Sequence, residues 1–233
     1  YTSTYPAKAQ KKEIVKFVPA SGAASRMFKD LFAFLDGDGD IEKSPFAKKF
    51  IENIQKFAFY QDLDKVLSAQ RNTLEECLQA GMYRKIISML LLEEGLDYGN
   101  LPKGLLKFHK YPAENRTPAQ EHLVEGVQYA VGKGEKVKVH FTVSPEHESK
   151  FKAEIAKVLP AIKAISGKEF EISYSQQKKS TDTIAVNMDN TPFTEDDGSL
   201  LFRPAGHGAL LENLNDIDAD LIFIKNIDNV VPD

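Results

Sequence analysis

A chain of 233 residues in which 42% of the side chains are hydrophobic can bury the core of one large α/β domain, with or without an insertion. Its formal net charge of −4, with no dense stripe of lysine and arginine interleaved with aromatics, excludes a nucleic-acid partner. The single cysteine, Cys77, excludes an internal disulfide and a metal site built from several cysteines, and it favours a cytoplasmic protein.

The sequence carries no membrane or secretory signal. No apolar run approaches the roughly 20 residues that a membrane-spanning helix needs, and no secretory leader opens the chain, so we expect no membrane partner. The chain begins with Tyr1 rather than Met and stops at Asp233, directly after an apolar strand. We therefore expect residues 1–233 to be one α/β domain that is truncated at its C-terminus.

The first chemically suggestive stretch is a predicted strand, a loop of small residues and a predicted helix. The apolar run 14–18 predicts the strand, and apolar residues at helical spacing from Met27 to Leu35 predict the helix. Small residues let backbone N–H groups approach an oxyanion, and Arg26 offers a planar cation suited to phosphate. An ordinary turn with a solvated Arg26 is the alternative. The small residues of the loop that are predicted to bind phosphate are Ala20, Ser21, Gly22, Ala23 and Ser25.

An acidic turn and a helical region come next. Residues 36–40 resemble the start of a calcium loop, but the sixth and twelfth positions of such a loop hold Ile41 and Ala47, so an acidic turn is the better interpretation. From 44 to 94, apolar residues recur at helical spacing, and Ser44-Pro45 is a typical helix start. We expect residues 36–94 to form a helical insertion beside the α/β core.

Alternating strands and helices follow from Thr117. A capping signature with proline opens a predicted helix at 117–131, another helix is predicted at 144–165, and a short one lies around Leu210. Strands that alternate with helices predict an α/β fold whose mainly parallel sheet is covered on both faces and binds ligands at the carboxyl ends of its strands. The predicted strands are 137–143, 170–174, 184–186, 200–202 and 221–224.

Three later stretches present residues that could share a site with the first loop. Lys103 stands between a proline and a glycine and could neutralise a phosphate, unless it is a solvated turn lysine. Gly206 and Gly208 would let the backbone approach a planar base beside His207, for which capping of a helix is the alternative. Asp228 follows an apolar strand and could hold Mg²⁺ or cap a turn. Because each stretch lies at or just after a predicted strand end, we expect all four at one edge of the sheet.

In this order the four stretches resemble the signature of the nucleotide-sugar pyrophosphorylases, in particular the uridylyltransferase branch. That signature runs Ala-Gly-Gly-x-Gly-Thr-Arg-Met or Leu, then Pro-Lys-Gly, then a Gly-x-Gly loop, then Asp-Asn at a strand end. More closely, the chain resembles a bacterial family described as a domain of unknown function (4301), whose longer members carry the same stretches. The matching residues are 20–27, 102–104, 206–208 and 226–229.

The resemblance implies a three-layer α/β/α Rossmann-like (GT-A) fold. It also implies a nucleotidyltransferase that joins a nucleoside triphosphate and a sugar 1-phosphate into a nucleotide sugar and releases pyrophosphate. In such an enzyme Arg26 and Lys103 would hold the triphosphate, and Asp228 would bind Mg²⁺. Residues for the sugar and a second metal carboxylate would come from beyond Asp233.

The resemblance also assigns residues to the nucleotide base. Gly206 and His207 would line the base pocket. Gln176, or its neighbour Gln177, resembles the glutamine that reads the base in that family, with a pair of surface glutamines as the alternative. The other histidines, His109, His122, His140 and His147, show no metal-ligand spacing, and the sequence assigns them no role.

Two other functions remain open on the sequence. A nucleotide- or nucleotide-sugar-binding module without catalysis is suggested because Ser21 and Ala24 replace glycines of the signature, and Ser25 replaces its threonine. A protein-interaction domain built on residues 44–94 would present an exposed apolar helical face. That face would include Met82, Ile86 and Leu90.

Overall fold

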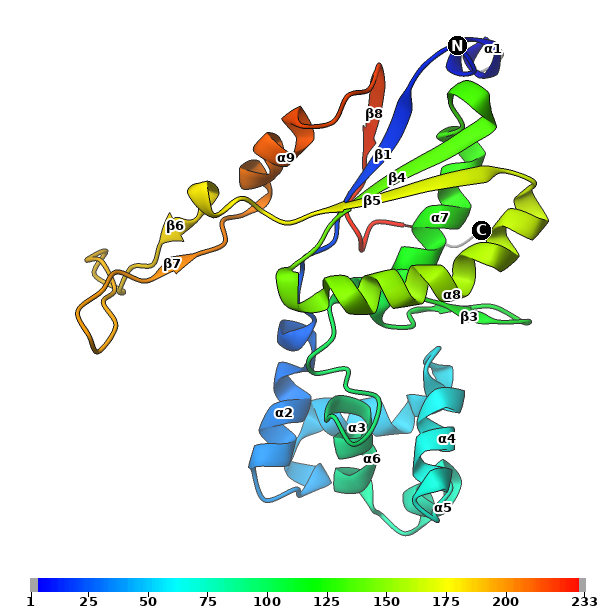
Figure 1. The fold of residues 1–233 in the computed structure, drawn as a ribbon. Helices are drawn as coiled ribbons and strands as arrows, with labels where there is room; N and C mark the ends of the chain where they lie inside the picture. Colours follow the sequence, from blue (N-terminus) through cyan, green and yellow to red (C-terminus); the bar gives the residue numbers. More distant parts are fainter. Residues whose placement is uncertain (1–3, 231–233) are drawn as a thin grey trace. The chain divides into compact units, whose positions relative to one another are not determined.

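The computed structural model of the chain describes residues 4–230, which divide into two compact units (Figure 1). The first unit comprises the residues up to Ser21 together with Leu123–Asn226. The second comprises Gly22–His122 together with the residues from Ile227. Each unit buries hydrophobic side chains of its own. Within residues 4–230, no helix combines the length and the apolar character needed to cross a bilayer.

A four-stranded parallel sheet forms the centre of the first unit (Figure 1). Its strands are neighbours in the order β5-β4-β1-β8, and each of the three pairings is parallel. All six residues of β1 are buried, as expected for a strand with neighbours on both sides. The chain is thus an α/β protein, as the alternation of strands and helices predicted. The strands, each predicted from the sequence, are β1 (Ile14–Pro19), β4 (Lys136–Thr142), β5 (Glu169–Ser175) and β8 (Leu221–Ile224).

One face of this sheet packs against two long helices. Val137, Val139 and Phe141 alternate along β4 and are fully buried on this face. The Phe141 ring lies 5.9 Å from that of Phe151 in α8, and a Cβ on Gly126 of α7 would come within 3.0 Å of Val137. The helices that lie wholly or mainly in this unit are α1 (Tyr5–Ala9), α7 (Pro118–Tyr129), α8 (Glu148–Ser166) and α9 (Leu211–Asn215), with 3-10 turns at Lys133–Glu135, Pro145–His147, Lys179–Thr181 and His207–Leu210.

Two of the predicted helix starts have the expected side-chain caps. Thr117 Oγ1 accepts a hydrogen bond from Gln120 N at 3.2 Å before α7, and Ser44 Oγ accepts one from Ala47 N at 3.4 Å. Ser144 does not cap α8 in this way, because a 3-10 turn intervenes and the Ser144 hydroxyl lies 3.3 Å from the imidazole of His147. The sequence signals are therefore correct for the starts of α3 (Pro45–Glu52) and α7, whereas α8 begins at Glu148, later than predicted.

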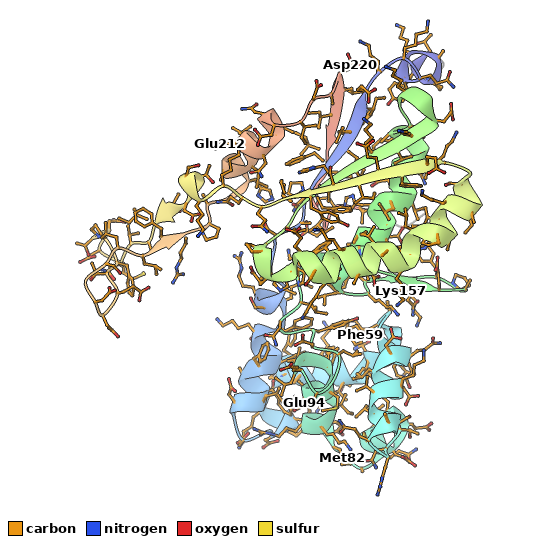
Figure 2. The ribbon with its side chains drawn as sticks, in the orientation of Figure 1. Phe59, Met82, Glu94, Lys157, Glu212 and Asp220 are labelled. Atoms are coloured by element: carbon orange, nitrogen blue, oxygen red, sulfur yellow. The ribbon has the colours of Figure 1, made fainter. Side chains whose placement is uncertain are left out.

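The predicted strands at 184–186 and 200–202 do not join the parallel sheet. The short strands β6 (Thr183–Ile184) and β7 (Phe202–Arg203) pair with each other in an antiparallel ribbon that continues through isolated bridges. Side chains stand out from both sides of this ribbon (Figure 2), and Phe202 is 56% exposed. The loop before His207 thus follows a strand of the ribbon, which corrects the expectation that all four stretches follow strands of one sheet.

Helices dominate the second unit and bury a hydrophobic core of their own. Ile86 and Leu90, which a protein-interaction domain would expose, are fully buried in that core, and Cys77 is buried there as expected. Met82, labelled in Figure 2, remains 37% exposed. The elements of this unit are α2 (Lys29–Asp36), α3 (Pro45–Glu52), α4 (Tyr60–Ala69), α5 (Leu74–Gln79), α6 (Tyr83–Leu91) and the hairpin β2 (His109–Lys110) and β3 (Asn115–Arg116), with 3-10 turns at Ser25–Phe28, Ile41–Lys43, Ile54–Lys56 and Lys103–Leu105.

Lys16 places a charge in the middle of β1, and its side chain is fully buried. Its ammonium donates to Glu125 of α7 at 2.8 Å, and Glu125 also pairs with Lys225, which follows β8. Burial lowers the pKa of Lys16 to about 8 despite the opposing effect of Glu125. Burial alone would raise the pKa of Glu125, but hydrogen bonds from the two lysines lower it. The Glu125 carboxylate therefore balances the charge of a buried lysine in the central strand.

Removing Glu125 should destabilise the fold more than removing Lys16. Glu125→Leu removes the carboxylate that pairs with a buried ammonium and should cost about 3–5 kcal/mol, whereas Lys16→Met leaves Glu125 with Lys225 and should cost at least about 2 kcal/mol less. Urea unfolding of both variants checks the difference. Lys138→Met is the matched control, because Lys138 also lies on a strand and pairs at 2.8 Å, with Glu13, but its side chain is 26% exposed. Equal costs for the Glu125 and Lys16 variants would contradict the argument.

The same lysine should make stability rise with pH in alkaline solution. Between its folded pKa of about 8 and its ordinary value of 10.5, the unfolded chain keeps a proton on Lys16 that the folded chain has lost. The free energy of unfolding should then increase by up to about 1.4 kcal/mol per pH unit from this group. As the pH rises across this range, the urea midpoint of the wild type should increase relative to that of Lys16→Met. A difference that stays constant with pH would refute the prediction.

Candidate functional site

Lys103 and Asp228 meet in the second unit although 125 positions separate them in the chain. Lys103 begins a 3-10 turn directly after Pro102, whose extended backbone leads into it. The Lys103 ammonium donates to an Asp228 carboxylate oxygen at 2.6 Å, and the two side chains are 30% and 34% exposed. The ion pair thus joins two residues that the sequence singled out, and it leaves both open to solvent.

The first loop runs beside the lysine turn. The N–H of Lys103 donates to the carbonyl of Gly22 at 3.0 Å, and Ala23 forms an antiparallel bridge with Pro102. These main-chain contacts hold the lysine against the loop whatever its side chain does. Parts of three predicted stretches, 22–27, 102–104 and 227–229, therefore belong to one compact unit.

A pocket of about 430 Å³ opens at the ion pair. Apolar side chains form part of its wall, and a cation, an imidazole and a carboxylate supply its polar groups. This mixture of apolar walls and a few polar groups is typical of small-molecule sites. The lining residues are Met27, Lys103, Phe108, His109, Pro118 and Asp228.

Arg26 lines a different pocket of the second unit. It is exposed in the 3-10 turn Ser25–Phe28 and borders a hollow together with Lys29 and Asp36. The loop leads into this 3-10 turn, and α2 starts four residues later than Ser25, so the small residues do not themselves form the helix N-terminus that the sequence suggested. Of the two predicted phosphate-binding cations, Lys103 therefore faces Asp228, whereas Arg26 does not line the same pocket.

The two residues that replace signature glycines have different surroundings. Ala24 is fully buried and belongs to the helical core of the second unit. Its methyl group therefore fills the core instead of narrowing the exposed side of the loop. Ser21 is exposed at the end of the first unit's segment. A Cβ at Gly22 would meet no atom within 4 Å, so packing within the chain does not demand glycine there.

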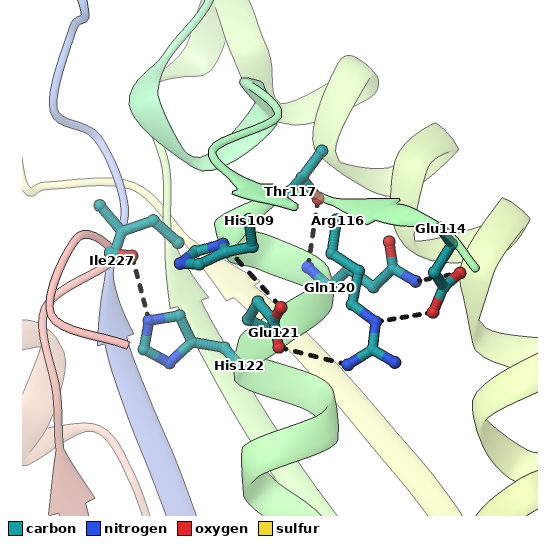
Figure 3. Close-up of polar contacts among 8 residues, drawn as sticks. All are labelled: His109, Glu114, Arg116, Thr117, Gln120, Glu121, His122 and Ile227. Atoms are coloured by element: carbon teal, nitrogen blue, oxygen red, sulfur yellow. Dashed lines mark hydrogen bonds and ion pairs between the residues drawn. The ribbon is translucent and has the colours of Figure 1, made fainter. Parts of the chain in front are cut away.

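A buried chain of polar groups, which sequence reasoning missed, leads to the pocket (Figure 3). Glu121 of α7 lies between His109 and Arg116, with a carboxylate oxygen 4.0 Å from His109 Nδ1 and the other 3.5 Å from Arg116 Nη1. His122, also buried, donates to the carbonyl of Ile227 at 3.2 Å and so holds the segment that carries Asp228. The hairpin β2–β3 brings His109 to the helix, and no spacing in the sequence signals that approach.

In the first unit, His207 lies beside Asn226. The imidazole Nε2 of His207 is 3.1 Å from the side-chain oxygen of Asn226, so the third and fourth predicted stretches meet there. The Gln176 amide donates to Glu148 at 2.8 Å. The amide of Gln177 instead lies against the main chain of Ala205, and with its oxygen and nitrogen exchanged it accepts from the N–H at 2.9 Å and donates to the carbonyl at 3.1 Å. Gln177, rather than Gln176, therefore contacts the loop that precedes His207.

His140 is the centre of a polar cluster in the first unit that sequence reasoning also missed. Its two ring nitrogens lie 2.8 Å from the hydroxyls of Ser173 and Ser175, and Asn213 donates to Ser175 at 2.9 Å. The ring stacks on Phe17 at 5.4 Å between centroids. Burial lowers the pKa of His140, so the imidazole is neutral near pH 7, donating through one nitrogen and accepting through the other. The parallel register of β4 and β5 aligns these positions, and no local sequence pattern signals that register.

The residues of the pocket fit a hard cation in one respect. Asp228 supplies a carboxylate, and Mg²⁺ is commonly held by one or two carboxylates together with substrate phosphates. Among residues 4–230, no group of three or more histidine, cysteine, aspartate or glutamate side chains is arranged to hold a metal. Asp228 is therefore the residue through which a magnesium–phosphate complex would contact this pocket.

The structure is that of an α/β protein with a mainly parallel sheet and a pocket that opens at a lysine–aspartate pair. The chain belongs to the family described as Domain of unknown function (DUF4301), whose model matches residues 1–233. No curated protein and no solved structure matches the chain.

The Lys103–Asp228 pair should contribute little to stability. Because both side chains are about one-third exposed, solvent screens the pair, and Lys103→Met or Asp228→Asn should change the free energy of unfolding by less than about 1 kcal/mol. Urea unfolding monitored by circular dichroism measures this. Losses of several kcal/mol would show instead that the pair is a structural element of the second unit.

Proposed function

We propose that the chain is the nucleotidyltransferase-like domain of an enzyme that makes a nucleotide sugar. An oxygen of a sugar 1-phosphate attacks the α-phosphorus of a nucleoside triphosphate, the bond from that phosphorus to the β-phosphate oxygen breaks, and pyrophosphate leaves. Such transfer depends mainly on positioning and on neutralising the developing charge. The substrates are therefore a nucleoside triphosphate and a sugar phosphate.

The meeting of Lys103 with Asp228 is the observation that carries this proposal. The family resemblance assigns the lysine to phosphate and the aspartate to a cation, two roles that require the residues to be close together. The two residues are 125 positions apart in the chain, so their contact at 2.6 Å in one pocket is not expected by chance. The contacts of Gly22 and Ala23 with residues 102–103 add a third stretch in the expected order.

Each residue has a defined task in the proposed reaction. Lys103 exchanges Asp228 for a phosphate oxygen and neutralises its charge. Asp228 holds Mg²⁺, which supplies electrostatic stabilisation of the transferring phosphate when it is bound. The resemblance assigns Arg26 to the triphosphate as well, but its place in a separate pocket makes Lys103 the residue on which the proposal rests.

The base is assigned to residues of the first unit. Gly206 and Gly208 have no atom within 4 Å of where a Cβ would stand, and their φ angles are not positive, so the chain itself places no demand for glycine there. Glycine at these positions can instead let a ligand approach the backbone closely. This supports a base-contacting role for Gly206 and His207. Gln176 belongs to the same proposed group, and its neighbour Gln177 reaches the glycine loop directly.

The proposed fold is the three-layer, Rossmann-like GT-A arrangement. Helices α7 and α8 cover one face of the parallel sheet. On the other face, Asn213 of α9 reaches Ser175 beside His140, which supports a third layer there. Magnesium dependence and a cytoplasmic location belong to this proposal as well.

The test is magnesium-dependent release of pyrophosphate from the full chain. The protein is incubated with a panel of nucleoside triphosphates and sugar 1-phosphates, and the reverse reaction is followed from nucleotide sugars and pyrophosphate. Asp228→Asn and Lys103→Met should each lower kcat/KM by about 100-fold or more, as expected for removal of a group that stabilises the transition state. Lys163→Met is the control, because it removes a lysine from an exposed 2.7 Å ion pair on α8.

Failure of every pairing to react, with the protein folded, would reject the enzyme. Calorimetry then separates the alternative of a non-catalytic binding module. Binding of nucleotide or nucleotide sugar that survives Asp228→Ala, without turnover in the parent, would favour that module. The buried position of Ala24 removes one reason for that module, since this methyl group does not narrow the loop, whereas Ser21 and Ser25 are exposed.

A further inference from the structure

His109 lies on the wall of the Lys103–Asp228 pocket, and Glu121 lies behind it (Figure 3). Their side chains are 11% and 2% exposed. His109 Nδ1 and Glu121 Oε1 face each other at 4.0 Å, which is too long for a hydrogen bond, and neither atom has a hydrogen-bond partner among residues 4–230. Buried polar atoms without partners are costly, so this pair of facing atoms demands an explanation.

The carboxylate of Glu121 has weak compensation for its buried charge. Arg116 approaches its other oxygen at 3.5 Å, and the Arg116 guanidinium is also engaged by Glu114 at 2.6 Å. A buried carboxylate is stabilised by a nearby positive charge. A protonated His109 supplies that charge, and a small movement of the ring would convert the 4.0 Å approach into a hydrogen bond.

The second ring nitrogen of His109 determines what the pocket can bind. Figure 3 shows it on the side of the ring away from Glu121, toward the Ile227 segment. In a neutral ring whose Nδ1–H faces Glu121, this nitrogen is a lone-pair acceptor that disfavours an anion. In the protonated ring it is a donor. The groups that face His109 are Glu121 on one side and Lys103 and Asp228 across the pocket.

We propose that His109 is a third phosphate-binding group of this pocket when its ring is protonated, and that Glu121, held by Arg116, is the positioning residue that orients the ring. Lys103 and His109 then present two cations to one anion, and binding of phosphate and protonation of His109 favour each other. The proposal rests on the proposed function for the identity of the anion, which is the pyrophosphate part of the substrate or product. Affinity for that part therefore rises as the pH falls.

The test is calorimetric titration of the full chain with inorganic pyrophosphate near pH 6, pH 7 and pH 8.5. The affinity of each variant is expressed relative to wild type at the same pH, which cancels the ionisation of pyrophosphate itself. His109→Gln should weaken binding by about 10-fold near pH 6, as for loss of one charge-assisted hydrogen bond, and much less near pH 8.5.

Glu121→Gln separates positioning from mere packing. Near pH 6 it should weaken binding of pyrophosphate by less than His109→Gln does, because the imidazole remains and only its orientation is lost. Combined with His109→Gln, it should add no further loss, whereas an independent packing defect would add to the loss. His147→Gln is the matched control, since His147 also has a glutamate beside it, Glu146 at 3.5 Å, and belongs to the first unit.

Nuclear magnetic resonance observes the protonation directly. The chain has five histidines, and the signal of His109 is the one missing from the His109→Gln spectrum. Near pH 7, pyrophosphate should move that signal toward the imidazolium position in wild type and less in Glu121→Gln.

Four results distinguish this proposal from the proposed function. Unchanged pyrophosphate affinity in His109→Gln at every pH overturns the role of His109, even if the enzyme turns over. No pyrophosphate binding by folded wild type overturns it as well. Binding that depends on His109 and on pH supports it, even if no nucleotide sugar is made, in which case the proposed function alone fails. An imidazole signal that does not respond to pyrophosphate also overturns it.

Discussion

The buried ammonium of Lys16 is the interaction on which the first unit is built. It lies at the middle of the central strand, where a parallel sheet covered by helices offers no water to a charge. Glu125 of α7 forms an ion pair with Lys16 and a second one with Lys225, which follows β8. One carboxylate therefore links β1, α7 and the end of β8. The residues that follow Lys225 are Asn226, which contacts His207, and Asp228, which contacts Lys103.

The partly exposed ion pair of Lys103 and Asp228 in the second unit is easier for a ligand to break than a buried ion pair would be. Lys103 and Asp228 remain partly exposed, so their attraction is screened and each can exchange its partner for phosphate or a cation at small cost. The position of the lysine does not depend on that attraction, because its backbone is hydrogen-bonded to Gly22. The buried groups behind the pocket behave differently. Glu121 is almost fully buried, so solvent screens its charge less than it screens the charges of Lys103 and Asp228.

Part of the candidate site could be read from the sequence, and part could not. The lysine and the aspartate were predicted to act together because each occupies a distinctive local pattern, and they do meet. Arg26 has an equally distinctive pattern, but the 3-10 turn Ser25–Phe28 carries it to another pocket. His109 and Glu121 were missed because neither has a local signature. Their pairing depends on the hairpin β2–β3, whose short strands leave no period-two pattern of useful length.

The sequence by itself determined the local elements. Periodicity located the four strands of the parallel sheet and the helices of 44–94, and caps such as Thr117 located helix starts, because these features depend on neighbours within a few residues. Tertiary structure alone decided which strands pair. The apolar runs near 184 and 200 read as strands, but their pairing with each other places them in a ribbon outside the sheet. Tertiary structure also decided which charged side chains are buried. A single sequence position does not reveal burial, yet Lys16 pairs with Glu125 of α7 and Glu121 faces His109 of the hairpin β2–β3.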